Sequence, residues 1–197
     1  QKDMNGNYQE YIKNLLWKCN FEWENVIPVM SDSHEHQSGM LKRILPLVKT
    51  PLLLYVEHDT PLVVTRKIDW RYLKDTVLSG KANVIRFHYE AFIPEPHKYL
   101  MIGEVEDNLL KTAQWSQRPH LALTNFYRGI LPFFSDNSNC FIEDLLYGQL
   151  VGAWEVNGME GWNNWRVYIY HPKGNIQRSL NLDGRGTDRK FEAEQIW

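Results

Sequence analysis

The 197-residue sequence is poor in cysteine, has no long hydrophobic run and carries almost no excess charge of either sign. Its two cysteines, Cys19 and Cys140, form neither a metal-binding spacing nor a disulfide framework, which favours a reducing, cytoplasmic compartment. No apolar run approaches the roughly 18 residues of a membrane span, and the opening QKDMNGNYQE lacks the pattern of a signal peptide. A formal net charge of -2 argues against nucleic acid as the main partner.

Aromatic residues are abundant, with 8 Trp, 10 Tyr and 8 Phe. Their flat rings can stack on sugars or nucleobases, but they also fill protein cores well, so both interpretations remain open. The length is sufficient for one compact domain covering residues 1–197.

Hydrophobic periodicity predicts an alternation of helices and strands. Helices are expected at residues 8–18, 40–48, 69–78 and 141–154, and strands at residues 26–30, 51–56, 83–89 and 167–170. Residues 99–126 are strand-like but irregular, and residues 172–197 are expected to form a lid loop or tail. The alternation predicts a single α/β, Rossmann-like domain with a mostly parallel central sheet flanked by helices.

Acidic residues follow two of the expected strands. Asp32 comes after VIPVM, and Glu57-His58-Asp59 comes after LLLYV. Ligands bind beyond the carboxyl ends of parallel strands, and two carboxylates there suit Mn²⁺ or Mg²⁺ held together with phosphate oxygens. The alternative is that these residues are solvated loop acids, or that Asp59 caps a turn before Pro61.

The segment LLLYVEHD resembles the metal-binding strand of GT-A glycosyltransferases, especially those of family 2, whose DXD-like motif binds the metal and the nucleotide-sugar diphosphate. The resemblance implies that Asp59 is a metal ligand and that Glu57 contacts the ribose, the metal or its waters. VIPVMSDS is similar to the earlier strand that contacts the nucleobase or ribose, which implies a role for Asp32 and Ser33. The chain opens with QKDMNGNYQE where that family has an apolar strand.

Three later segments extend the resemblance. FIEDLLYG looks like the motif whose aspartate is the catalytic base of inverting enzymes, which implies that role for Asp144. Acidic residues are also favourable in the first turn of any helix, so Glu143 and Asp144 have a structural alternative. His171 corresponds to a late histidine that completes the metal shell. Arg178 and Arg185 lie in a segment that could fold over the diphosphate, although such residues are more often solvated charges.

The resemblance implies a metal-dependent, inverting glycosyltransferase that moves a sugar from a nucleoside diphosphate sugar, with UDP-sugar favoured, to a hydroxyl of a glycan acceptor. Trp115 could form a platform for the acceptor sugar, although core packing is the more common role of a tryptophan. The alternatives are a metal-dependent phosphoesterase or nuclease and a non-catalytic carbohydrate-binding domain. A nucleotidyltransferase would be expected to carry a Gly-rich loop with a basic residue near the first strand, and the sequence has none there. The sequence leaves the oligomeric state open.

Overall fold

The structure, a computed structural model, describes residues 2–31, 35–134 and 140–182. It divides into two units, Gln1–Glu35 and His36–Trp197, which are described separately. In the first unit, helix α1 (Lys2–Phe21) contains the helix expected at residues 8–18. The strand expected at residues 26–30 is wrong, because this segment has no regular secondary structure and Ile27 is 84% exposed. A short β-branched run cannot form a strand without a partner for its backbone groups.

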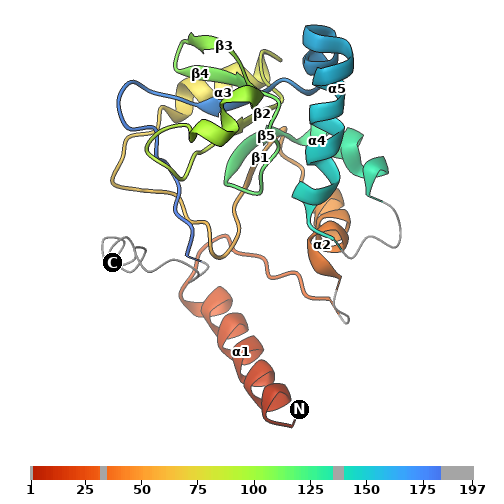
Figure 1. Ribbon diagram of the computed structural model, residues 1–197. Helices are drawn as coiled ribbons and strands as arrows, with labels where there is room; N and C mark the ends of the chain where they lie inside the picture. Colours follow the sequence, from red (N-terminus) through yellow and green to blue (C-terminus); the bar gives the residue numbers. More distant parts are fainter. Residues whose placement is uncertain (1, 32–34, 135–139, 183–197) are drawn as a thin grey trace. The chain divides into compact units, whose positions relative to one another are not determined.

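The second unit is a mixed α/β structure built on one six-stranded sheet (Figure 1). Its elements in chain order are α2 (His36–Ile44), the 3-10 helix η1 (Leu45–Leu47), β1 (Leu52–Tyr55), α3 (Trp70–Leu78), β2 (Val84–Arg86), η2 (Glu95–Leu100), β3 (Met101–Glu106), β4 (Leu109–Thr112), β5 (His120–Leu123), α4 (Thr124–Ile130), η3 (Leu131–Phe133), α5 (Ile142–Trp165) and β6 (Val167–Tyr170). The helices and strands expected within residues 40–89 and 141–170 are thus present, with shifted ends.

The sheet has the strand order β1-β5-β2-β6-β4-β3. Only the β2–β6 pair is parallel, and the other four neighbouring pairs are antiparallel. The expectation of a mostly parallel sheet is therefore wrong. The irregular residues 99–126 supply three strands, β3, β4 and β5, and each of them pairs antiparallel with its neighbours.

The β3–β4 hairpin shows why the antiparallel half was difficult to predict. Its two-residue turn consists of Asp107 and Asn108, both with positive φ (52° and 63°). Two successive left-handed residues form the type I′ turn that matches the twist of a hairpin, and Asp and Asn tolerate this conformation better than most residues. The pair Asp-Asn is the local sequence feature that could have indicated the hairpin.

Helix α3 begins as expected, because the Asp69 carboxylate accepts a 3.1 Å hydrogen bond from the backbone N–H of Tyr72. It packs on β1, β2 and β5, while α4 packs on β5 and η1. Figure 1 shows α5 standing beside the sheet on the same side as α2 and α4. Strand β1 lies at the edge of the sheet, and Leu54 is 45% exposed, so this continuously apolar strand is not covered on both faces.

Helix α5 contains a kink at Gly158, whose φ of 55° and ψ of -133° are not helical. The last part of the helix turns so that Gly161 lies against the backbone of Ala153. This close approach lets Trp162 and Trp165 enter the core, where the Trp162 indole N–H donates to the carbonyl of Thr112 at 3.0 Å. The kink therefore fixes α5 against the sheet.

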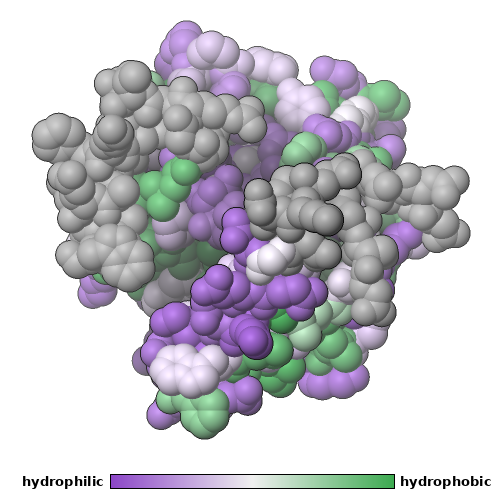
Figure 2. All heavy atoms as spheres, turned by 90° about the horizontal axis from the view of Figure 1, so that it is seen from below, coloured by the Kyte–Doolittle hydropathy of each residue, from purple (hydrophilic) through white to green (hydrophobic). Residues whose placement is uncertain are grey.

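The core of the second unit lies between the sheet and its helices and includes Leu73, Ile85, Leu146, Leu150 and Val167. In the view of Figure 2, the coloured residues include both hydrophilic and hydrophobic side chains. Among the helices of the described residues, none is both long enough and apolar enough to span a bilayer.

Candidate functional site

The strand directions bring three carboxyl ends to one edge of the sheet. Strands β1 and β2 are both antiparallel to β5, so they run in the same direction, and β6 is parallel to β2. Tyr55 at the end of β1 and Arg86 at the end of β2 both pair with His120 at the start of β5. Glu57 and Asp59 follow β1 directly, so they lie at this edge as the sequence predicted.

Tyr55, His120 and Arg86 stand side by side on one face of the sheet, because residues paired across strands point the same way. The Tyr55 ring stacks on the His120 ring with centroids 5.0 Å apart. One imidazole nitrogen of His120 bonds the carbonyl of Arg118 at 2.7 Å, and the other bonds the Tyr127 hydroxyl. Burial lowers the pKa of His120 to about 4, so its ring is neutral near pH 7.

Glu57 is held by two donors on the same carboxylate oxygen. The Tyr55 hydroxyl donates to Oε1 at 2.9 Å, and the Gln37 amide donates to it at 2.8 Å. Burial raises the pKa of Glu57, the Tyr55 hydrogen bond opposes that shift, and the nearby charge of Asp59 adds to it. The carboxyl group is therefore a fixed, partly desolvated acid at the end of β1.

Gln37 also joins Glu57 to the start of α5. Its side-chain oxygen accepts hydrogen bonds from the backbone N–H of Ile142 at 3.2 Å and from the side-chain amide of Gln117. The backbone N–H of Gln117 in turn donates to Glu143 at 3.1 Å. The two acidic segments EHD and FIED, to which the resemblance assigns roles in one active site, are thus linked through the side chains of Gln37 and Gln117.

Asp59 has an unsatisfied buried oxygen. Its backbone carbonyl accepts from the N–H of Leu182 at 2.7 Å, but its Oδ1 atom is buried and accepts no hydrogen bond from the described residues. A buried carboxylate oxygen without a donor is costly unless a ligand or cation compensates it. This observation fits the predicted contact with a divalent cation and does not fit a turn-capping role for the Asp59 side chain.

No three His, Cys, Asp or Glu side chains of the described segments are grouped so that they could hold a metal ion by themselves. A cation at Asp59 and Glu57 would therefore need further oxygen ligands from a bound substrate. Mg²⁺ commonly binds in this way, through one or two carboxylates together with phosphate oxygens.

His171 lies in a different place. It follows β6, three strand positions from β1, which corresponds to about 14 Å across the sheet. Its backbone N–H donates to the carbonyl of Asn108 at 2.7 Å. In the described residues, His171 does not form a group with Asp59 and Glu57 that could hold a metal ion.

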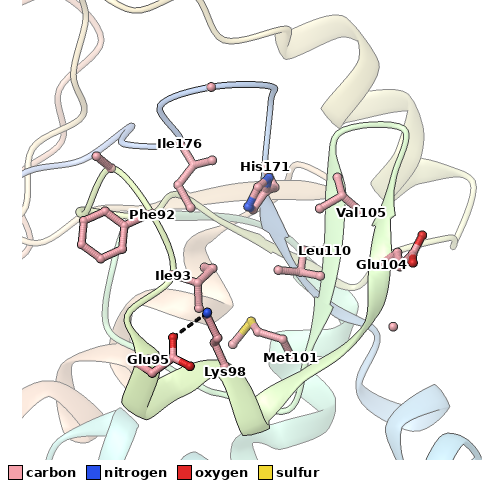
Figure 3. Close-up of a pocket in the computed structure, with 13 residues that line it drawn as sticks. Phe92, Ile93, Glu95, Lys98, Met101, Glu104, Val105, Leu110, His171 and Ile176 are labelled. Atoms are coloured by element: carbon pink, nitrogen blue, oxygen red, sulfur yellow. Dashed lines mark ion pairs between the residues drawn. The ribbon is translucent and has the colours of Figure 1, made fainter.

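His171 instead lines a pocket of about 760 Å³ (Figure 3). Figure 3 shows His171 near Ile176 and Val105 at one end of the pocket, and the 2.5 Å ion pair between Lys98 and Glu95 at the other. Most of the remaining lining is apolar and comes from Phe92, Ile93, Met101 and Leu110.

The structure places Asp144 at the exposed surface of the first turn of α5, next to the half-buried Glu143. Arg178 is 8% exposed, and its guanidinium donates to the backbone carbonyls of Asn175 (3.0 Å) and Gln177 (2.6 Å). It therefore stabilises its own loop. Asp32, Ser33 and Arg185 lie outside the described residues.

The described part of the expected lid, residues 172–182, packs along the end of the sheet. The N–H of Arg178 donates to the carbonyl of His88 at 2.7 Å, and the N–H of Leu180 donates to that of Pro61 at 2.9 Å. The remaining residues of the expected lid, 183–197, are not among those described. In its described part, the segment closes the sheet edge as a fixed strap and does not form a free loop.

Trp115 belongs to the core, which corrects its interpretation as an acceptor platform. It is 1% exposed, and its ring lies within 6.5 Å of the rings of His120, Phe126, Tyr127 and Trp165. A ring that is enclosed on all sides offers no face to a sugar.

Sequence reasoning missed three residues of this site: Gln37, Gln117 and Arg86. Glutamine has no periodicity or motif that distinguishes a linking role from a solvated one. Arg86 could have been noticed, because it is the one charged residue in the apolar run NVIRF, and a charge in a buried strand requires compensation.

Comparison with known proteins gives no match: no family model, no curated protein and no solved structure is significantly similar to this chain. The fold and the site define a mixed α/β protein with a linked acidic cluster at one edge of its sheet.

Proposed function

We propose that this chain is a metal-dependent, inverting glycosyltransferase domain that uses a nucleoside diphosphate sugar, with UDP-sugar favoured, and a hydroxyl of a glycan acceptor. The observation that carries the proposal is the linkage of Glu57 to the start of α5 through Gln37. Donor activation and deprotonation of the acceptor must take place within one site, and this linkage brings the acidic segments proposed for the two tasks together.

Asp59 and Glu57 would hold Mn²⁺ or Mg²⁺ together with the donor diphosphate. The cation would supply neutralisation of the negative charge that develops on the leaving diphosphate. The unsatisfied buried oxygen of Asp59 supports this role. We leave His171 out of the metal shell, because it lies three strands away from β1.

Asp144 is the proposed base. It accepts the proton of the acceptor hydroxyl, and the acceptor oxygen then forms a bond with the anomeric carbon. The bond from that carbon to the diphosphate oxygen breaks, and its electron pair leaves with the diphosphate. Exposure of Asp144 in the first turn of α5 leaves its carboxylate accessible to an acceptor, while Glu143 holds the turn through Gln117.

The test is thermal stabilisation of the purified protein by UDP, GDP, ADP and CDP, each with Mn²⁺ and with EDTA. We expect stabilisation by a nucleoside diphosphate that requires Mn²⁺, amounting to about 2.7 kcal/mol at 100 times the dissociation constant. Asp59→Ala should abolish this stabilisation, whereas His58→Ala, a change at an exposed neighbour, should preserve it.

Two results would contradict the proposal. The first is equal stabilisation in EDTA, which would show that nucleotide binding does not require a metal ion. The second is stabilisation by none of the nucleoside diphosphates. Release of free phosphate from a phosphoester would then indicate a phosphoesterase, and binding of glycan alone would indicate a carbohydrate-binding domain.

A further inference from the structure

The pocket that contains His171 is large and is lined mainly by apolar side chains (Figure 3). Its volume of about 760 Å³ lies within the range of sites that enclose small organic ligands. Leu110 and Ile176 contribute buried parts of the lining, whereas Phe92 is 67% exposed and Val105 is 42% exposed. Apolar side chains that remain in water beside a pocket of this size gain free energy when an apolar ligand covers them.

Two walls of this pocket are fixed by hydrogen bonds to backbone carbonyls. The N–H of Ile176 donates to the carbonyl of Ala91 at 3.1 Å, which joins the segment after β6 to the segment after β2. The ring of the buried His88 donates through Nε2 to the carbonyl of Phe92 at 3.2 Å. A ligand that enters between walls already held in this way pays little for ordering them.

Two glycines of the lining leave part of the pocket unfilled. Gly103 lies where the register of β3 and β4 shifts, with a φ of 69°, and Gly174 has a φ of 85°. Positive φ explains why glycine occupies both positions. A Cβ atom at either position would meet no atom of the described residues within 4 Å, apart from those of its chain neighbours. The space beside these glycines is therefore not used by packing within the described residues.

His171 supplies a polar group at one end of the pocket. Its backbone N–H donates to Asn108, but its ring makes no hydrogen bond, ion pair or ring contact with any described residue. A neutral imidazole offers one donor and one acceptor, so the ring can bind a hydroxyl or a carbonyl of a ligand. At the other end, Lys98 is already paired with Glu95. The lining therefore suits a mainly apolar group that carries a hydrogen-bonding atom at its His171 end.

One wall of the pocket contacts the helix that carries the proposed base. Lys98 and Tyr99 are neighbours in η2, and the Tyr99 hydroxyl lies 3.2 Å from the Tyr147 hydroxyl of α5. Tyr147 follows Asp144 by three residues, and residues with this spacing lie on the same side of a helix. Through η2, the pocket is therefore adjacent to the side of α5 that presents Asp144.

We infer that this pocket binds an apolar group of a small-molecule ligand, and that the ligand is the acceptor, held by an apolar aglycone. The second half of the inference rests on the proposed function, because only that function makes the ligand an acceptor. The acceptor is then a glycoside with an aryl or alkyl group. The pocket distinguishes it from a free sugar, which has no apolar group to place there.

The first test measures the affinity of two probes, 2-naphthol and naphthalene, which share one ring system and differ by a hydroxyl. We expect Phe92→Ala to weaken both probes by about tenfold or more, because it removes a large apolar contact. Phe21→Ala is the matched control, since Phe21 is 75% exposed in α1 and does not line the pocket. His171→Ala should weaken 2-naphthol by about fivefold more than naphthalene, because only 2-naphthol can bind the ring.

A second measurement uses only the wild-type protein. With ¹³C-labelled methionine methyl groups, NMR spectra report the surroundings of Met101, which lines the pocket, and of Met159, which lies on α5 outside it. We expect 2-naphthol to shift the Met101 signal and to leave that of Met159 unchanged. Three results would overturn the inference: binding of neither probe, equal loss of affinity in Phe92→Ala and Phe21→Ala, or equal shifts of the two methionines.

Transfer assays with methyl, octyl and phenyl glycosides of one sugar test the identity of the ligand. We expect a KM for the octyl or the phenyl glycoside that is about tenfold or more below that for the methyl glycoside, and a smaller ratio in Phe92→Ala. If transfer occurs with equal KM for all three, the acceptor assignment is wrong and the proposed function stands. If the probes bind in the pocket but no sugar is transferred from any donor, the apolar site stands and the glycosyltransferase function is wrong.

Discussion

Gln37 donates a 2.8 Å hydrogen bond to the Glu57 carboxylate, which joins α2 to the end of β1. The opposite atom of the same amide accepts from the backbone N–H of Ile142 at 3.2 Å. Glu57 cannot donate when ionised and a backbone N–H cannot accept, so only one orientation of the amide satisfies both partners. A single neutral side chain thereby sets the spacing between two acidic segments.

Replacement of this link should destabilise the protein. Gln37→Leu retains most of the side-chain volume but removes one of the two donors to Glu57. It also leaves the Ile142 N–H and the Gln117 side-chain amide without the acceptor that they share. We expect a loss of about 1–3 kcal/mol in the free energy of unfolding. Gln149→Leu on the exposed side of α5 is the control, with an expected change within about 0.5 kcal/mol. Urea unfolding of both variants measures the difference, and equal stability would show that the link contributes nothing.

The pH dependence of stability should reveal the environment of Glu57. Because the pKa of Glu57 is raised above its ordinary value of 4.5 in the folded state, the folded protein retains this proton more strongly than the unfolded chain. The proton is lost as the pH rises through the folded pKa, so stability falls over that interval. Glu57→Gln keeps an oxygen for Tyr55 and Gln37 but has no proton to lose.

The stability of Glu57→Gln relative to the wild type should therefore increase from pH 4 to pH 7. The comparison between the two proteins is necessary because His120, with a pKa of about 4, shifts stability in the opposite direction. Because burial favours the neutral ring of His120, the free energy of unfolding falls as the pH drops below about 6.5, by up to about 3 kcal/mol at the acid end. This contribution cancels in the difference. A difference that stays constant from pH 4 to pH 7 would contradict the raised pKa.

Two glycines of α5 should respond to alanine in opposite ways. A Cβ atom at Gly161 would lie 1.9 Å from the carbonyl oxygen of Ala153, which is backbone and cannot move cheaply. Gly161→Ala should therefore destabilise the protein by about 1–3 kcal/mol or more. A Cβ atom at Gly148 would meet nothing within 4 Å, so Gly148→Ala should stabilise it by about 0.5–1 kcal/mol. Thermal unfolding distinguishes the two, and equal effects would mean that the kink at Gly158 does not bring these segments together.

The acidic end of β1 could be predicted because an apolar run that changes abruptly to Glu-His-Asp is a local pattern. The helix cap at Asp69 could be predicted for the same reason. The direction of β5 and its pairing with β1 and β2 depend on which strands meet, and side-chain periodicity does not contain that information. The roles of Gln37 and Trp115 depend on neighbours distant in the sequence, so they became apparent only once the chain was folded.

The final prediction separates Asp144 from Glu143. Asp144→Asn removes the proposed base from an exposed position without disturbing a hydrogen bond of the described residues. It should leave the affinity for UDP with Mn²⁺ within about twofold of the wild type. General-base catalysis contributes about 10²–10⁴-fold to rate, so sugar transfer should fall by at least about 100-fold.

Glu143→Gln provides the comparison, because Glu143 accepts the hydrogen bond from Gln117 and its charge acts on Arg86. A neutral acceptor keeps the hydrogen bond with Gln117 but removes the negative charge near Arg86. We therefore expect Glu143→Gln to retain more of the transfer rate than Asp144→Asn does. If transfer persists in Asp144→Asn and disappears in Glu143→Gln while both variants still bind UDP with Mn²⁺, the base is Glu143. Loss of the carboxylate that removes the acceptor proton stops the chemistry without preventing binding of the donor.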